Sequence, residues 1–289
     1  MAAEATRLRL EAALGGPVGE LRRLGGQHGV DHYRLALADG RAGFAKVAGR
    51  QDEAAGFAAE AHGLRWLREA EAVPVPAVLA AGDTVLVIEW VGEGQPGPEA
   101  ARRFGADLAR LHAAGAGHFG APWPGIIAGL PLPNDEAARW PDWYATCRLL
   151  PYARMARDAG TLSAADVRLV ETVCSHIGAL AGPPEPPSRI HGDCWSGNVL
   201  WSDGRGWLID PAAHGGHRES DLAMLALFGA PYLARIIAGY EEVRPLAAGW
   251  PDRVPLHQLH PLLVHVCLFG GSYRAAALDA SRAVLRQAP

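Results

Sequence analysis

The sequence contains 289 residues, which fits one large domain or two lobes. Its 27 basic and 31 acidic residues give a formal net charge of −4, which argues against binding nucleic acid or an anionic membrane through a broad basic surface. Hydrophobic residues make up 49% of the chain and charged residues 20%, which excludes a disordered protein. Lys46 is the only lysine beside 26 arginines, which raises the question of what an arginine could not do at this position.

Nothing in the sequence predicts secretion or membrane insertion. The N-terminal residues lack the apolar core of a signal peptide, and no apolar stretch reaches the length of about 18 residues that a membrane-spanning helix needs. The four cysteines, Cys147, Cys174, Cys194 and Cys267, show neither a CxxC pair nor zinc-like spacing. We therefore expect a cytoplasmic, soluble protein without structural disulfides, and a monomer rather than an oligomer.

The N-terminal part of the chain predicts a small β-rich unit. Residues 33–37 and 42–47 alternate in hydrophobicity as strands do, and Asp39-Gly40 between them favours a hairpin turn. Apolar residues recur with helical period over 51–71, and the prolines within 73–76 end that helix. The apolar, β-favouring run at 84–91 predicts a buried strand.

Beyond a glycine- and proline-rich linker at 92–98, the pattern becomes mainly helical. Helices are predicted over 99–114, 140–159 and 163–181, the last with Ser163 as its N-cap. A break at 182–187 is followed by two short strands, and the remaining residues again favour helix; the strands are predicted at 198–201 and 206–209. We therefore predict a β-rich N-lobe at 1–91 and a helical C-lobe at 92–289.

Two segments of the C-lobe carry residues suited to hydroxyl and metal chemistry. The segment 191–198, HGDCWSGN, places an aspartate and an asparagine five residues apart on one loop. Asp193 could accept a proton from a hydroxyl group, and the amide oxygen of Asn198 could coordinate Mg²⁺. Asp210 ends the second predicted strand, where its carboxylate could bind the same ion.

The third segment places Lys46 in the middle of a hydrophobic strand, an unfavourable position for a charge unless carboxylates and phosphates meet it. Glu53 and Glu60 on the following helix could supply the carboxylate, and Glu60 is preferred because it lies near the apolar face. Upstream, the loop at 24–30 could offer backbone amides to phosphates through its glycines, Gly25, Gly26 and Gly29, although it does not match GxGxxG.

The order Lys46, Asp193, Asn198 and Asp210 is that of the groups with which protein-kinase-like folds transfer phosphoryl groups. We therefore predict the α+β class and a bilobal protein-kinase-like fold, with a small antiparallel β-rich N-lobe and a larger, mainly helical C-lobe. The expected cofactors are ATP and Mg²⁺.

Longer motifs resemble one family within this superfamily. HGDxWSGNVL from His191, IDPA from Ile209 and GHRESDLAM from Gly216 resemble the fructosamine kinase (ketosamine-3-kinase) family of the aminoglycoside phosphotransferase-like branch. The resemblance extends over most of the chain, through Phe119-Gly120, LPLPN at 130–134, Trp143-Tyr144, RLLP at 148–151 and the His265 to Tyr273 segment. It implies ATP-dependent phosphorylation of the 3-hydroxyl of a ketosamine, either a fructosamine or a ribulosamine, free or protein-bound, and thereby deglycation.

Further roles are expected from position. Glu89, Trp90 and Val91 follow the strand at 84–91 and are expected to form the interlobe hinge, whose backbone would meet adenine. His191 and Asp221 are expected to support the catalytic loop by hydrogen bonds rather than to touch substrate.

Four side chains keep more than one interpretation. Trp195 could stack on a sugar or simply pack, and His265 on an apolar helix is typical of a core histidine, although the resemblance keeps it as a substrate candidate. His214 and His217 are spaced like metal ligands, but no third ligand is evident, so a polar loop is expected there.

Two alternatives to a ketosamine kinase remain open from the sequence. The acceptor could instead be an aminoglycoside, choline or homoserine. The chain could also be a nucleotide-binding pseudokinase, although it retains Lys46, Asp193, Asn198 and Asp210.

Overall fold

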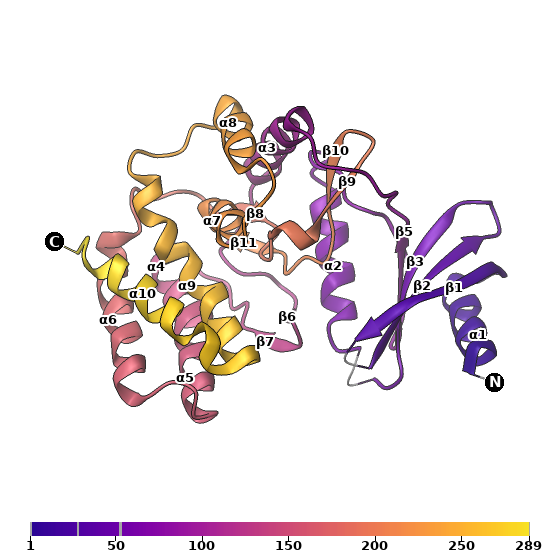
Figure 1. Cartoon of the computed structure of the whole chain (residues 1–289), viewed down its shortest axis with the longest axis horizontal. Helices are drawn as coiled ribbons and strands as arrows, with labels where there is room; N and C mark the ends of the chain where they lie inside the picture. The colour runs from indigo at the N-terminus through magenta and orange to yellow at the C-terminus, as the bar shows by residue number, and fades with distance from the viewer. Residues whose placement is uncertain (1, 28, 52–53, 289) are drawn as a thin grey trace.

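The computed structural model describes residues 2–27, 29–51 and 54–288. The chain forms a β-rich N-terminal part and a larger helical part, and the two termini lie at opposite ends of the long axis (Figure 1). This arrangement confirms the predicted α+β class with a β-rich N-lobe and a helical C-lobe. The lobe boundary at residue 92 stays a prediction.

The N-lobe contains a five-stranded antiparallel sheet in the order β1-β2-β3-β5-β4. The strands are β1 (Val18–Gln27), β2 (Val30–Leu37), β3 (Ala42–Ala48), β4 (Val78–Ala81) and β5 (Val85–Glu89). The predicted strands correspond to β2, β3 and β5, whereas β1 and β4 were not predicted. The glycine-rich segment differs from the expected loop: Gly25 and Gly26 lie in β1, whose pairing with β2 continues to Gln27 and Val30.

The two faces of this sheet pack against different helices because successive side chains of a strand point in opposite directions. Ala45 and Val47 of β3 share a hydrophobic cluster with Leu10 of α1 (Ala2–Leu14). The alternate residues, including Lys46, face α2 (Phe57–Arg68), which packs against β4 and β5. The strand pattern thus directs Lys46 toward α2.

Helix α2 is shorter than the helix predicted over 51–71. It begins at Phe57, and residues 54–56 before it form a turn. Glu53, the alternative partner of Lys46, lies outside the described residues. The buried residues Phe57, Ala61 and Leu64 recur at the helical spacing of three and four residues, and Glu60 lies beside this stripe.

The C-lobe is built mainly of helices, seen from magenta to yellow in Figure 1. They are α3 (Pro98–Ala113), α4 (Trp140–Tyr144), α5 (Leu150–Asp158), α6 (Ala164–Leu180), α7 (Glu219–Leu227), α8 (Leu233–Val243), α9 (Trp250–Phe269) and α10 (Arg274–Leu285). The helix predicted over 140–159 is divided by a π-helical turn, Ala145–Leu149. Ser163 caps α6 as predicted, in a capping box with Asp166.

Short antiparallel strand pairs connect these helices and carry the loops of the site. They are β6 (Gly125–Ile127) with β7 (Leu130–Leu132), β8 (Ser188–Ile190) with β11 (His214–Gly216), and β9 (Val199–Ser202) with β10 (Arg205–Leu208). The predicted strands at 198–201 and 206–209 correspond to β9 and β10, each shifted by one residue.

Helices α3 and α8 cross closely because each has a glycine at the contact. A Cβ atom on Gly105 would lie 1.9 Å from the carbonyl oxygen of Ile236, and one on Gly239 would lie 1.9 Å from that of Arg102. We expect Gly105→Ala to lower the free energy of unfolding by about 1–3 kcal/mol, because the backbones must separate.

The control for this substitution is Gly178→Ala in the exposed face of α6, where no atom lies within 4 Å of the added Cβ. It should raise stability by up to about 1 kcal/mol, since alanine favours helix. Denaturant unfolding of both variants measures the difference. Equal effects would contradict the close crossing of α3 and α8.

Helix α9 contains two internal prolines, and Tyr144 compensates for one of them. Pro261 cannot donate the hydrogen bond that the carbonyl of His257 would accept in a regular helix. The Tyr144 hydroxyl donates to the carbonyls of Leu256 (3.0 Å) and His257 (3.2 Å) instead. This contact joins α9 to α4 in the core of the C-lobe.

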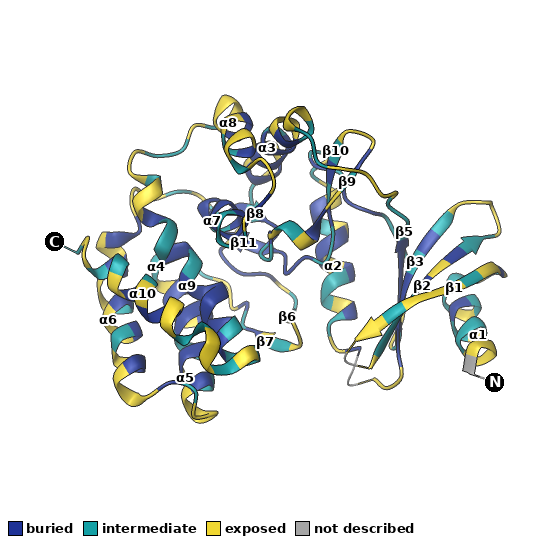
Figure 2. Cartoon of the chain, viewed as in Figure 1, coloured by how far each residue is buried: buried dark blue, intermediate teal, exposed yellow. Residues whose placement is uncertain are grey.

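One described stretch, Trp250–Leu285, is long and apolar enough by length and composition to cross a membrane, with mean hydropathy 1.2 in its most apolar window. This was not predicted from the sequence. Leu259, Leu263 and Val266 of α9 are fully buried in the C-lobe core, whereas 39% of the most apolar window as a whole is buried. Figure 2 shows buried residues along the inward faces of α9 and its neighbours.

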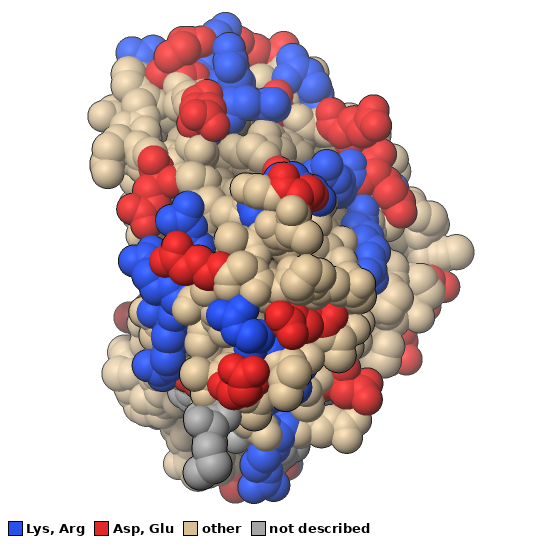
Figure 3. Space-filling model, turned by 90° about the vertical axis from the view of Figure 1, so that its right-hand side faces the viewer, with Lys and Arg blue, Asp and Glu red and all other residues tan. Residues whose placement is uncertain are grey.

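The surface of the N-lobe carries charges of both signs. On the face formed by α1 and the first strands, basic and acidic side chains lie in small groups separated by uncharged surface (Figure 3). Ion pairs such as Arg23–Asp31 (2.6 Å) and Arg41–Asp39 (2.7 Å) join such neighbours. Opposite charges therefore offset each other locally on this face.

Candidate active site

Lys46 lies between two carboxylates at the junction of the lobes. Its Nζ atom is 2.9 and 2.7 Å from Oε1 and Oε2 of Glu60 and 2.6 Å from Oδ1 of Asp210. The lysine is only 9% exposed. Burial alone would lower the pKa of Lys46, but the two carboxylates raise it above its usual value, so the ammonium stays charged.

The approach of α2 to the Asp210 segment depends on Gly63, one turn after Glu60. A Cβ atom on Gly63 would lie 3.1 Å from Cγ of Pro211 and 3.2 Å from Cβ of Ala213. The small residue lets the helix that carries Glu60 pack directly on the segment that carries Asp210.

The β9–β10 hairpin brings the two predicted metal ligands together. Val199 pairs with Leu208, and the amide of Ile209 donates to the carbonyl of Asn198 at 3.1 Å. Asn198 therefore lies directly beside the Ile209-Asp210 segment. Asp210 has a φ of +51°, a left-handed conformation that is uncommon for residues other than glycine and is found at strained functional positions.

Asn198 is oriented by three acceptors. Its Nδ2 atom donates to the carbonyl (2.9 Å) and Oδ2 (2.9 Å) of Asp193, and lies 3.4 Å from the carbonyl of Asp210. These contacts fix the position of Nδ2, so Oδ1 of Asn198 lies on the other side of the side-chain amide. With the Asp210 carboxylate, whose side chain is 43% exposed, this supplies oxygen donors of the kind Mg²⁺ prefers. The residues present fit such an ion.

Asp193 lies at the centre of this group, and the residue is partly buried. Burial raises the pKa of Asp193 to about 7, although the hydrogen bond from Asn198 lowers it and the charge of Asp210 raises it further. A carboxylate with a pKa near neutrality can accept a proton from a substrate hydroxyl effectively. The Asp210 carboxylate differs: burial disfavours its charge, yet Lys46 holds the pKa of Asp210 below its usual value.

The loop that carries Asp193 is anchored by Asp221 at the start of α7. Its carboxylate accepts hydrogen bonds from the amides of His191 (2.7 Å) and Gly192 (2.9 Å), and from Nε2 of His112 (3.1 Å). Nδ1 of the same imidazole contacts the Tyr240 hydroxyl at 2.8 Å. Sequence reasoning missed His112 and Tyr240, because nothing local relates them to a loop so distant in the chain.

His191 also holds the loop rather than facing substrate. It is fully buried, and its Nε2 donates to the carbonyl of Ile209 at 2.8 Å while Nδ1 accepts from the amide of Asp193 at 3.2 Å. Burial lowers the pKa of His191, so the neutral ring makes both contacts. This geometry couples the Asp193 loop to the Asp210 segment.

The other predicted nucleotide contacts lie along the N-lobe sheet. Gly25 and Gly26 occupy the end of β1, and Gly29 immediately precedes β2, whose His32 is the register partner of Lys46. Glu89 ends β5; its carboxylate accepts from the amide of Ala77 at 3.1 Å.

Trp90 and Val91 continue the chain from Glu89 toward the C-lobe. The Trp90 amide donates to the carbonyl of Ala42 at 3.2 Å, and Arg34 lies 4.8 Å from the Trp90 ring. The predicted hinge therefore begins beside Ala42, the first residue of β3.

The predicted substrate residues Trp195 and His265 lie near each other through Phe228. Trp195 is 39% exposed and contacts Phe228 edge-on at 6.0 Å between ring centroids. Phe228 in turn lies 5.0 Å from His265. His265 is half-buried rather than a core histidine, which corrects the expectation drawn from its apolar helix.

The expected polar loop around His214 and His217 is wrong. Both residues are buried, His214 on β11 and His217 just before α7. Other side chains of the kind that bind metal ions do lie close to His217. His217, Glu219 and His257 offer ligand atoms within 4.8 Å of one another. Arg253, however, binds both oxygens of Glu219 at 2.9 and 2.6 Å, so the cluster serves as a buried ion pair.

This ion pair predicts an acid-sensitive contribution to stability. Burial disfavours the charge, but the nearby His257, whose Nε2 lies 3.4 Å from Oε2 of Glu219, and the hydrogen bonds from Arg253 lower the pKa of Glu219 to about 2 from its ordinary 4.5. The stabilisation is complete above the unfolded-state pKa and is lost as pH falls through about 2. The full difference is worth on the order of 3 kcal/mol.

We therefore expect Glu219→Gln to be less stable than wild type at pH 7 and to lose less further stability between pH 5 and pH 2. Denaturant unfolding across this range measures both effects. Glu242→Gln, which removes the exposed pair with Arg102, is the control. A wild-type pH profile in Glu219→Gln would contradict the assignment.

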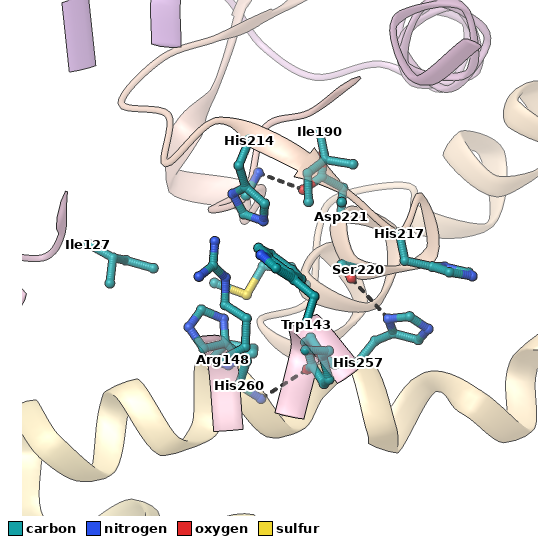
Figure 4. A pocket seen from close by; sticks show the side chains of 15 residues that line it. Ile127, Trp143, Arg148, Ile190, His214, His217, Ser220, Asp221, His257 and His260 are labelled. Atoms are coloured by element: carbon teal, nitrogen blue, oxygen red, sulfur yellow. Dashed lines mark hydrogen bonds between the residues drawn. The ribbon is translucent and has the colours of Figure 1, made fainter. Parts of the chain in front are cut away.

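A small cavity of about 30 Å³ lies beside the loop that carries Asp193, where Ile190 and Gly192 line it (Figure 4). Its lining includes Trp143, Arg148, His214 and His260, and among the described residues Nε of Arg148 and Nε2 of His260 have no hydrogen-bond partner. A cavity of this size has room for about two water molecules, which could satisfy these atoms. The cavity therefore lies among the buried side chains on which this loop packs.

The sequence is similar to proteins of one family. A family model described as fructosamine kinase matches residues 9–287. A protein named a probable ketoamine kinase in Synechocystis sp. is 34% identical over 238 residues, which cover 80% of this chain and 79% of the relative. An Escherichia coli K12 protein, also named a probable ketoamine kinase, is 32% identical over 228 residues, which cover 77% and 78%.

Solved structures extend the similarity to the fold. A Thermobifida fusca protein assigned to the fructosamine-3-kinases superposes with a TM-score of 0.93 at 53% identity, over 98% of this chain and 99% of the other. An aminoglycoside phosphotransferase in complex with AMP-PNP and hygromycin B shares the fold alone, with a TM-score of 0.69 at 18% identity over 98% of both chains. These matches confirm the family predicted from the motifs. The chain belongs to the fructosamine kinase family.

Proposed function

We propose that the protein transfers the γ-phosphoryl group of ATP to the 3-hydroxyl of a ketosamine. The observation that carries this proposal is the convergence of two parts of the chain distant in sequence, residues 46–60 and 193–210, which brings Lys46, Glu60, Asp193, Asn198 and Asp210 into one site. These are the groups that kinase-like folds use for phosphoryl transfer.

On the nucleotide side, Lys46 would bind phosphate oxygens while Glu60 holds its ammonium in place. The backbone at Gly25, Gly26 and Gly29 would cover the phosphates, and the backbone of Glu89, Trp90 and Val91 would meet adenine. Asn198 and Asp210 would hold Mg²⁺, which when bound neutralises negative charge on the phosphates.

On the acceptor side, Asp193 would orient the 3-hydroxyl and receive its proton as the new O–P bond forms. The bond between the γ-phosphorus and the β–γ bridging oxygen breaks, and ADP leaves. Asn198 fixes the reacting carboxylate through the 2.9 Å contact to Oδ2. Most of the rate enhancement would come from positioning and electrostatics, as is general for phosphoryl transfer.

The acceptor class rests on the relatives, whose names specify ketoamine or fructosamine. Both fructosamines and ribulosamines carry the required 3-hydroxyl. Trp195 and His265 are the residues proposed to contact the acceptor. Phosphorylation at this position would destabilise the ketosamine and release the free amine, which is deglycation.

The test is an acceptor panel with purified protein, ATP and Mg²⁺, in which ADP release is measured. The panel contains a fructosamine, a ribulosamine, an aminoglycoside, choline and homoserine. We expect turnover of a ketosamine with a kcat/KM at least about tenfold above every other class, equivalent to about 1.4 kcal/mol. Preferred turnover of another class would overturn the acceptor, and nucleotide binding without any transfer would indicate a pseudokinase.

A further inference from the structure

A continuous set of aromatic rings extends from the active site across the surface of the C-lobe. We call Phe228, His265, Phe269 and Tyr273 the aromatic wall. His265 lies at its centre, with ring centroids 5.0 Å from Phe228, 5.4 Å from Phe269 and 4.7 Å from Tyr273. Phe269 is 60% exposed, so the wall offers a ring face to solvent instead of closing a core.

The wall meets the active site at Trp195. The amide of Trp195 donates to the carbonyl of Asp193 at 3.0 Å, and its indole contacts Phe228 at 6.0 Å. Gly197 makes this position possible, since a Cβ atom there would lie 2.2 Å from the Trp195 ring. A ligand that extends away from Asp193 over Trp195 would therefore next reach the aromatic wall.

The wall presents little charge. Arg274, the cation next to Tyr273 in sequence, is bound by both carboxylate oxygens of Asp166 at 2.8 to 3.0 Å. His265 donates from Nδ1 to the carbonyl of Pro261 at 2.8 Å, and burial lowers the pKa of His265, which favours the neutral ring. Such a surface suits aromatic or branched apolar groups, which stack on rings and whose removal from water is favourable.

We infer that the aromatic wall is a subsite for the substituent on the acceptor's amine nitrogen, and that it favours aromatic or branched apolar substituents over small or acidic ones. This rests on the proposed function, because the ketosamine's 3-hydroxyl at Asp193 sets the direction of the substituent. The acidic class is disfavoured because the described wall residues offer no cation to pair with it. No wall residue is among the groups proposed to carry out transfer, so the wall acts on acceptor binding rather than on transfer.

The test compares three ketosamines that share one sugar and differ in the amine, derived from glycine, phenylalanine and aspartate. For wild type we expect the KM of the phenylalanine derivative to be about tenfold below that of the glycine derivative, with similar kcat, and the aspartate derivative to have the highest KM. Phe269→Ala should reduce the phenylalanine-to-glycine preference to about twofold. Because Phe269 is 60% exposed, we expect this variant to fold as wild type does.

The matched control is Tyr232→Ala, which removes an aromatic side chain that is 48% exposed and lies outside the wall. It should leave the preference unchanged. Turnover of all three derivatives with equal KM, or an equal loss on all three in Phe269→Ala, would overturn the subsite alone. Absence of turnover on every ketosamine would overturn the proposed function and the subsite with it.

Discussion

Asp193→Asn should lower kcat for phosphoryl transfer by about 10²- to 10⁴-fold, the usual contribution of a general base, while nucleotide affinity stays near that of wild type. The asparagine oxygen can still accept the hydrogen bond that Asn198 now donates to Oδ2 of Asp193, so the loop should keep its geometry. The neutral amide, however, cannot take the proton of the acceptor hydroxyl. Single-turnover transfer and calorimetric binding of a non-hydrolysable ATP analogue measure the two quantities separately.

The matched control for this change is Asp203→Asn in the turn between β9 and β10. Asp203 is exposed and has a φ of +50°, which asparagine also adopts readily. It should transfer phosphate at the wild-type rate. Unchanged turnover in Asp193→Asn would remove Asp193 from the mechanism.

Lys46→Arg should lower kcat/KM for ATP by about 10- to 100-fold despite preserving the charge, which corresponds to about 1.4 to 3 kcal/mol. The Nζ atom contacts three carboxylate oxygens between 2.6 and 2.9 Å in a site that is 9% exposed. A planar guanidinium is wider than an ammonium and cannot occupy the same point between Glu60 and Asp210. Steady-state kinetics with varied ATP measures the effect.

Arg41→Lys, the reverse exchange in an exposed ion pair with Asp39, is the control and should behave as wild type. Thermal unfolding of both variants without nucleotide separates a loss of fold from a loss of ATP use. Wild-type kinetics in Lys46→Arg would show that arginine can replace the single lysine, so that its presence would have no functional reason.

Local patterns in the sequence were sufficient to predict the main parts of the site. Strand alternation placed Lys46 on one face of β3, and helical periodicity placed Glu60 on the face of α2 that meets it. The order and short spacing of Asp193, Asn198 and Asp210 predicted one loop and one hairpin, which the pairing of β9 with β10 provides. Each of these inferences needed only residues near one another in the chain.

The missed features depend on tertiary contacts or on weak patterns. Strand β1 is mostly exposed and interrupted by register shifts, so it has no clear alternation of apolar residues. The link from Asp221 through His112 to Tyr240 joins residues more than 100 positions apart. Helix α9 continues through Pro255 and Pro261, which local propensity would treat as breaks; Tyr144 compensates at one of them.

The burial of His214 and His217 also depends on tertiary contacts that local sequence does not predict. Their sequence neighbours are glycines and charged residues, which favour a loop. In the fold, His214 lies 5.2 Å from Trp143 and His217 lies 5.0 Å from Trp140, measured between ring centroids. These partners come from a helix about seventy residues earlier, so only the assembled C-lobe brings them together.

Transfer of the γ-phosphoryl group to the 3-hydroxyl of a ketosamine is tested most directly by ³¹P nuclear magnetic resonance. Purified protein reacts with ATP, Mg²⁺ and a fructosamine of a lysine derivative. We expect a new phosphomonoester resonance coupled to the proton on C3 of the sugar, formed as ADP appears, and absent in Asp193→Asn. Release of inorganic phosphate as the only product, or a phosphomonoester at another carbon, would contradict it.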